Sequence, residues 1–123
     1  MDIVAAFPSV AEKCLLRKMR KMRIDEDLVG WTPSFMRERR VKMVIDGHEE
    51  EEIGVTTGLP QGSAVSPILF VIYISEVHGA VEGKCNIDSI SFVDDVTWIE
   101  TGRSIPEVQG KLGRAASQAM AWV

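Results

Sequence analysis

Residues 87–100 of the chain read IDSISFVDDVTWIE, two short alternating runs on either side of Asp94 and Asp95. An alternation with a period of two is typical of β-strands, and aspartate is common in the turn between two strands. The stretch therefore predicts a β-hairpin that carries both aspartates at its tip. Aspartates also occur in turns for their local hydrogen bonds alone, so the pair by itself identifies no site.

Apolar residues crowd this aspartate pair. Ile90 and Phe92 alternate before the turn, and Val96 and Trp98 alternate after it. Carboxylates in apolar surroundings lose hydration, and a divalent cation would offset that loss. A third carboxylate would complete such a metal site, and Asp2, at the end of a strand predicted over residues 2–7, is the candidate.

A loop rich in glycine and proline, GLPQGSAVSP, occupies residues 58–67. Gly58 and Gly62 would let the backbone approach a ligand closely, while Gln61 can form hydrogen bonds with a base or a sugar. The pattern also fits a tight connection before a helix. The strongly apolar residues 68–74 predict that helix and favour a position buried on all sides.

Two further helices have recognisable starts. Asp25 is a predicted N-cap, and residues 104–107, SIPE, have the spacing of a capping box. A hairpin is predicted over residues 41–55, because Asp46-Gly47 suits the positive φ angles of a tight turn. Its four adjacent glutamates, residues 49–52, predict a solvated loop rather than a metal site.

The first predicted helix begins at Pro8 and extends to about Met22. Its apolar face contains Val10, Cys14 and Leu15, and the opposite face is strongly basic. This basic face could contact nucleic-acid phosphates or could be an ordinary solvated helix face. Its members are Lys13, Arg17, Lys18, Arg20, Lys21 and Arg23.

Composition places the chain among single soluble domains. Its 123 residues are 46% hydrophobic and 26% charged, which predicts one compact domain over residues 1–123. The net charge of −4 hides an asymmetry, because residues 1–48 hold ten basic against seven acidic side chains and the remainder four against eleven. The two cysteines form no disulfide framework or metal-ligand pattern, and the two histidines, His48 and His78, are assigned no role. No targeting or membrane-spanning segment is visible, so an intracellular protein is expected.

Three motifs together resemble a known family. They are DIVAAF at residues 2–7, GLPQGS followed by SPILF at residues 58–63 and 66–70, and FVDD at residues 92–95. In this order they resemble the palm of reverse transcriptases, and they are most similar to the non-LTR (LINE-like) retrotransposon group. The resemblance covers almost the whole chain. It implies an α+β, palm-like fold, in which a small, mostly antiparallel sheet holds the strand of Asp2 and the hairpin of Asp94 and Asp95, with helices on one face.

The resemblance also implies roles for the motif residues. Asp2 and Asp94 would hold two Mg²⁺ ions, with Asp95 as a weaker or indirect ligand. Two such ions activate a primer 3′-hydroxyl and stabilise the in-line transfer of a nucleotidyl group. Phe7 would lie against the nucleotide sugar and exclude a 2′-hydroxyl, although an aromatic core residue is the alternative. The remaining nucleotide and template contacts would come from Ile3, Val4, Gln61, Gly62 and Ser63.

The family's fingers and thumb have no counterpart in these residues, so we expect a palm fragment that is inactive alone. RNA template, DNA primer and dNTPs would be the partners of the parent protein, which would act in the nucleus. Two alternatives remain open. One is a non-enzymatic relic that at most binds nucleic acid through its basic helix. The other, disfavoured by Gln61 and Phe7, is an RNA-templated RNA polymerase.

Overall fold

The computed structural model describes residues 5–85 and 87–122. The chain divides into two compact units, one over Ala5–Ile72 and the other from Tyr73 onward. The predicted contributions of Asp2, Ile3 and Val4 lie outside the described residues, and the prediction of one domain over residues 1–123 is untested. The elements are α1 (Glu12–Lys21), α2 (Glu26–Met36), β1 (Arg39–Val41), β2 (Val44–Ile45), β3 (His48–Glu49), β4 (Ile53–Val55), α3 (Ser66–Cys85), β5 (Asp88–Phe92), β6 (Asp95–Ile99) and α4 (Ile105–Trp122).

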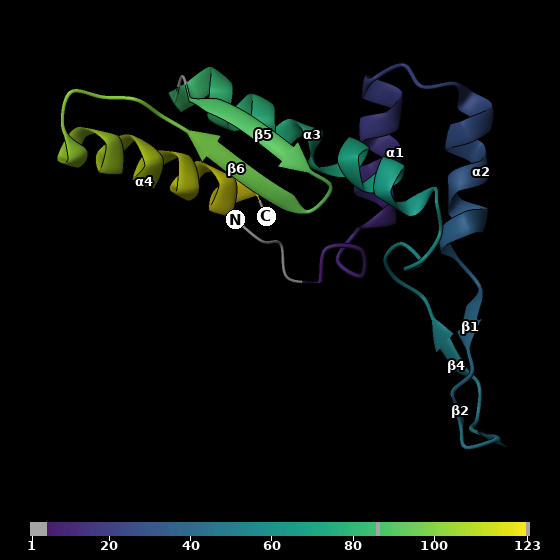
Figure 1. Ribbon diagram of the computed structural model, residues 1–123. Helices are drawn as coiled ribbons and strands as arrows, with labels where there is room; N and C mark the ends of the chain where they lie inside the picture. Colours follow the sequence, from purple (N-terminus) through teal and green to yellow (C-terminus); the bar gives the residue numbers. More distant parts are fainter. Residues whose placement is uncertain (1–4, 86, 123) are drawn as a thin grey trace. The chain divides into compact units, whose positions relative to one another are not determined.

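Helices α1 and α2 lie side by side in the first unit (Figure 1). The predicted N-cap of α2 is confirmed, because the Asp25 Oδ1 atom accepts a hydrogen bond from the Asp27 N–H at 2.9 Å. Leu15 and Met19 of α1 and Val29 of α2 are almost completely buried. Apolar burial at helical spacing therefore stabilises this pair.

The predicted strand end and helix start near Pro8 are wrong. Residues 5–9 form turns, in which the Ser9 N–H donates to the Ala5 oxygen at 2.9 Å, and the helix begins only at Glu12. Ala5 has a φ of +54°, which no extended strand contains. The side chain of Ser9 also donates to the Ala6 oxygen at 2.9 Å, and this local bond competes with helix formation.

A β-arm follows α2. Strand β1 pairs with β4, and β2 pairs with β3, both antiparallel. The predicted turn is confirmed, because Asp46 and Gly47 have φ values of +50° and +80°. All four glutamates of residues 49–52 are exposed, as predicted. Glu49 pairs with Lys42, and Glu52 pairs with Arg40 at 3.2 Å.

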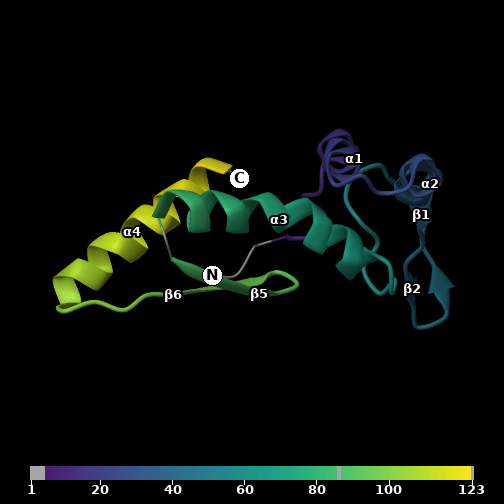
Figure 2. The ribbon, with the colours of Figure 1, turned by 90° about the horizontal axis from the view of Figure 1, so that it is seen from above.

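In the second unit, the antiparallel hairpin of β5 and β6 carries α3 and α4 on one face (Figure 2). The core between them contains side chains from both helices and the start of the hairpin, with Trp98 packed against it; its buried members are Val77, Val81, Ile87, Ala115 and Ala119. The capping box of α4 is confirmed, because the Ser104 Oγ atom accepts from the Glu107 N–H at 3.4 Å. The mixture of helices and small antiparallel sheets confirms the α+β class.

The structure decides which apolar residues of the hairpin and of α3 are buried. Ile90 and Phe92 are 60% and 81% exposed, whereas Val96 is buried, so the apolar residues of the two strands lie on opposite faces of the hairpin. Helix α3 is not buried on all sides, because Ile68 is 62% exposed. Among the described residues, no helix is long and apolar enough to cross a membrane.

Candidate active site

The tip of the β5–β6 hairpin carries the predicted metal ligands. Phe92 pairs with Asp95, so the connection is a two-residue turn of Val93 and Asp94, and Asp95 is already the first residue of β6. The Asp94 side chain is half-buried and Asp95 is exposed. Within the described part of the chain, neither carboxylate accepts a hydrogen bond or joins an ion pair. Both are therefore available as oxygen ligands.

The turn itself is strained. Val93 has a φ of +55°, in the left-handed region that a β-branched residue rarely adopts. Such a conformation costs roughly 1–3 kcal/mol and is retained mainly where function or the surrounding structure requires it. The strain at the residue before Asp94 is thus an independent indication of a functional hairpin tip.

His78 of α3, which the sequence assigned no role, connects this hairpin to its supporting helix. The Nδ1 atom lies 2.6 Å from the Ser89 Oγ atom, and the Nε2 atom lies 3.0 Å from the Ser91 Oγ atom. Both serines belong to β5 and share its inward face. Alternation in the sequence contained no signal for this role, because it does not show which side of β5 packs and the two partners lie 11 and 13 positions from His78.

We predict that His78→Ala destabilises the chain by about 1–3 kcal/mol, because two half-buried hydroxyl groups lose their hydrogen-bond partner. Urea unfolding of the variant would measure this difference. His48→Ala is the matched control, since His48 lies exposed in β3 and should change stability by less than about 0.5 kcal/mol. Equal stability of the two variants would contradict a structural role for His78.

The nucleotide-binding residues predicted around Phe7 and the glycine loop come together in the first unit. The Leu59 N–H donates to the Phe7 oxygen at 2.8 Å, which joins the loop directly to the Phe7 segment. The half-buried Phe7 ring packs edge-on against Phe70, with the ring centroids 5.4 Å apart. The backbone of Phe7 is therefore fixed by the loop and its ring by α3.

Gly58 is the point of closest approach between these segments. Its φ is +74°, and a Cβ atom there would lie 2.4 Å from the Pro8 Cα atom and 2.5 Å from the Phe7 oxygen. Further along the loop, Gln61 and Gly62 are exposed and Ser63 is half-buried. The Ser66 hydroxyl, at the start of α3, donates to the Pro60 oxygen at 2.5 Å. Glycine is thus required at position 58 for packing, and the exposed Gln61 side chain is accessible to a ligand.

The predicted metal site is only partly represented. Asp2, its third carboxylate, lies outside the described residues. Among residues 5–85 and 87–122, no three potential ligands gather in a group that could hold a metal ion. The two unpartnered oxygen donors at the hairpin tip fit Mg²⁺, which binds through few protein carboxylates. The two-ion site therefore stays a prediction.

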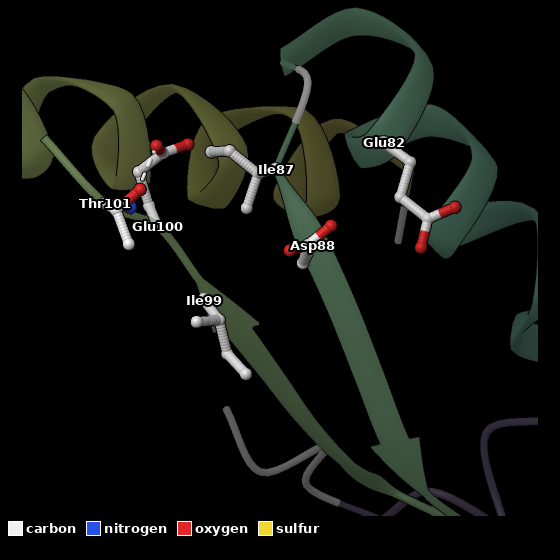
Figure 3. Close-up of a pocket in the computed structure, with 6 residues that line it drawn as sticks. All are labelled: Glu82, Ile87, Asp88, Ile99, Glu100 and Thr101. Carbon is white, nitrogen blue, oxygen red and sulfur yellow. Dashed lines mark hydrogen bonds between the residues drawn. The ribbon is translucent and has the colours of Figure 1, made fainter.

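A polar pocket lies at the opposite end of the hairpin, where Glu82, Asp88 and Glu100 are among the lining residues (Figure 3). Glu100 is already engaged, because the Lys111 Nζ atom donates to its Oε1 atom at 3.0 Å. This hydrogen bond lowers the pKa of Glu100 below its ordinary value, against the opposing effect of burial. The ion pair with Lys111 therefore gives Glu100 a structural role in this pocket.

The basic face of α1 is confirmed except at one position. Lys13, Arg17, Arg20 and Lys21 are exposed, but Lys18 is only 4% exposed. Lys18 cannot contact a phosphate from this buried position, so its predicted role is wrong. Lys18 follows Cys14 by four positions and Leu15 by three, so it lies at the edge of the apolar face of α1, where a lysine can bury its aliphatic stem.

Comparison with known proteins decides the family. The family described as reverse transcriptase (RNA-dependent DNA polymerase) matches residues 1–121, nearly the entire chain. The chain belongs to the reverse transcriptase family. It is 28% identical over 109 residues to the retrovirus-related Pol polyprotein of the type-1 retrotransposable element R2 of Popillia japonica, a match that covers 81% of this chain and 18% of that protein. It is likewise 28% identical over 109 residues to the RNA-directed DNA polymerase of the mobile element jockey of Drosophila melanogaster, with 85% and 12% covered.

This reverse transcriptase chain spans less than a fifth of the length of either relative. No solved structure matches it significantly. The predicted relation to non-LTR retrotransposon reverse transcriptases is confirmed by the R2 and jockey relatives. Reverse transcriptases act on a nucleic-acid template and primer and use divalent metal ions. The roles of individual residues remain predictions.

Proposed function

We propose that this chain forms the palm of an RNA-directed DNA polymerase of a non-LTR retrotransposon. The observation that carries the proposal is the hairpin tip, where two carboxylates without a partner among the described residues follow a strained valine inside the motif order of a reverse transcriptase. The hairpin with helices on one face supports the palm-like architecture. In the nucleus, the parent protein would copy an RNA template from a DNA primer.

Asp94 and Asp2 would be the principal ligands of two Mg²⁺ ions, with Asp95 as the weaker ligand. When bound, the ions would lower the pKa of the primer 3′-hydroxyl and stabilise the charge that develops on the transferred phosphate. The hairpin contributes rigidity, because His78 fixes β5 to α3 through Ser89 and Ser91. Carboxylates held on rigid elements keep their geometry during the reaction better than carboxylates on a free loop.

The nucleotide would be selected by the first unit. Phe7 would pack against the sugar, where its ring leaves no space for a 2′-hydroxyl, while Gln61, Gly62 and Ser63 would line the nucleotide and template side. The backbone of Ile3 and Val4 would face the triphosphate. The hydrogen bond between the Leu59 N–H and the Phe7 oxygen supports this assignment, because it joins the Phe7 segment to the glycine loop that carries Gln61, Gly62 and Ser63.

Primer extension by the full-length element protein tests the proposal. With Mg²⁺ and dNTPs, we expect extension of a DNA primer on an RNA template, and its loss on chelation of the metal. The 123-residue chain alone should show none, because the chain spans less than a fifth of the length of either relative. Extension that persists in excess chelator would contradict the two-metal mechanism.

Nucleic-acid binding by the basic face of α1 is a second candidate function. Lys13 and Arg17 are one helical turn apart and exposed, and within the described residues neither has an ion-pair partner. Arg20 is partly engaged by Glu26 at 3.6 Å. This exposed charge favours contact with phosphates, and it would also be the binding surface of a non-enzymatic relic.

We predict that the double variant Lys13→Ala/Arg17→Ala weakens RNA binding and lowers the slope of log K against log salt by about 1–2. Filter binding at several salt concentrations would measure the slope. Arg114→Ala removes an exposed cation from α4 and should leave the slope unchanged. Binding that is independent of Mg²⁺ and of Asp94→Asn, in a full-length protein that does not extend primers, would favour the relic.

A further inference from the structure

Arg39, the first residue of β1, holds three backbone carbonyl groups at once. Its Nε atom donates to the Met36 oxygen at 3.0 Å, at the C-terminal end of α2. Its Nη2 atom donates to the Thr57 oxygen at 2.8 Å and to the Gly58 oxygen at 2.7 Å. A planar guanidinium group suits this arrangement, because its donors diverge in one fixed plane.

These contacts join the end of a helix to the beginning of the glycine loop. The last carbonyl groups of a helix lack partners within the helix and carry partial negative charge, so an arginine there is favourable. Thr57 and Gly58 lie 18 and 19 positions beyond Arg39 in the chain. The bonds therefore determine where the loop starts relative to α2.

The position of the loop is transmitted to Phe7 through its backbone. Gly58 approaches the Phe7 oxygen and Pro8 so closely that no Cβ atom fits, and the next residue, Leu59, donates its N–H to that same oxygen. A displacement of Gly58 must therefore displace the Phe7 segment or break the Leu59 bond. Arg39 is thus two bonded steps from the residue that would contact the nucleotide sugar.

Arg39 also lines a pocket beside the predicted template side of the loop, together with Pro8, Pro60 and Gln61. The neighbouring Arg40 lines this pocket too, but its Nη1 atom donates to the Glu52 Oε2 atom of the β-arm at 3.2 Å. The two adjacent arginines therefore bind different parts of the chain. Arg39 binds carbonyl groups at the start of the glycine loop, whereas Arg40 binds a side chain of the β-arm.

We propose that Arg39 is a positioning residue for nucleotide selection: it anchors the glycine loop and thereby sets the place of Phe7 against the sugar of the incoming nucleotide. The inference rests on the proposed function, since it assigns Arg39 to the same nucleotide site. Arg39 acts through carbonyl groups of the chain and touches no reacting atom. Its loss would therefore affect nucleotide affinity and sugar discrimination more than the rate of the chemical step.

The first test uses the 123-residue chain. Hydrogen exchange of the Leu59 amide should become roughly tenfold faster or more in Arg39→Ala, because the loop opens locally. The Val29 amide of α2 should keep its protection and show that the variant is folded. Arg40→Ala is the matched control and should leave Leu59 exchange unchanged. Unchanged exchange in Arg39→Ala would overturn the positioning role.

The second test uses primer extension by the full-length element protein. In Arg39→Ala we expect KM for dNTPs to rise about tenfold and the preference for dNTPs over rNTPs to fall, with kcat changed less than threefold. Arg39→Lys, which retains charge without the planar fork, should recover only part of the preference. If either variant fails to fold, Arg39→Gln, which keeps a polar hydrogen-bond donor on a shorter side chain, is assayed in the same way.

The two tests fail in distinguishable ways. Faster Leu59 exchange with unaltered sugar preference would overturn the link from the loop to nucleotide selection. A wild-type full-length protein that extends no primer would contradict the proposed polymerase function and, with it, selection by Arg39. A fall in kcat at unchanged KM and sugar preference would overturn the inference by placing Arg39 in the chemical step.

Discussion

Replacing Asp94 by asparagine is expected to reduce primer extension by the full-length protein about a thousandfold, which corresponds to about 4 kcal/mol of transition-state stabilisation. Asparagine has nearly the same shape but lacks the negative charge that holds a divalent cation. The side chain is half-buried and, within the described residues, has no partner, so its removal breaks no bond that supports the fold. Steady-state extension at saturating Mg²⁺ would measure the loss.

Metal binding can be followed separately on the 123-residue chain. Mn²⁺ should broaden the amide resonances of Val93, Asp94 and Asp95, and Asp94→Asn should abolish most of that broadening. Asp88→Asn is the matched control, because Asp88 is an exposed carboxylate at the other end of the same hairpin. Retained extension in Asp94→Asn, or equal loss in Asp88→Asn, would refute the assignment of Asp94 as a metal ligand.

Gly58→Ala is expected to destabilise the unit over Ala5–Ile72 by about 3–5 kcal/mol. The φ of +74° costs an L-residue roughly 1–2 kcal/mol, and the new methyl group would overlap the backbone of Phe7 and Pro8. Backbone atoms cannot move aside as the end of a flexible side chain can. Because folded domains are stable by only about 5–15 kcal/mol, urea unfolding should show a large shift of the midpoint.

Gly62→Ala separates the two causes of this effect. Gly62 has a similar φ of +85°, but within the described residues, its chain neighbours aside, no heavy atom lies within 4 Å of the position that a Cβ atom would occupy. This variant should therefore lose only the conformational part, about 1–2 kcal/mol. Equal destabilisation by both substitutions would show that the contact between Gly58 and the Phe7 segment contributes nothing.

Local signals in the sequence predicted those parts of the fold that depend on neighbouring residues. Asp25 caps α2, Asp46-Gly47 forms the turn of the β-arm, and Ser104 caps α4. Each is a bond or backbone preference within three positions along the chain. The same local reasoning failed near Pro8, where the left-handed conformation of Ala5 and the Ser9 side-chain bond favour a turn.

The buried face of a strand was harder to predict than the strand itself. Alternation correctly indicated two strands around Asp94 but not which side of β5 packs against the helices. Ser89 and Ser91 face inward because His78 satisfies their hydroxyl groups, so the more apolar Ile90 and Phe92 are left exposed. A hydropathy pattern contains no information about a hydrogen-bond partner 11 or 13 positions away.

The sequence alone determined the family, through three motifs in a fixed order, and with it the candidate residues Asp2, Phe7, Gln61, Asp94 and Asp95. It also determined the starts of α2 and α4 and the turn at Asp46-Gly47, because these depend on short-range bonds and on the φ preferences of single residues. Only the tertiary structure decided that Lys18 is buried, that His78 supports the hairpin and that Arg39 holds the glycine loop. Each of these depends on contacts between segments distant in the chain, whose geometry exists only once the segments have packed together.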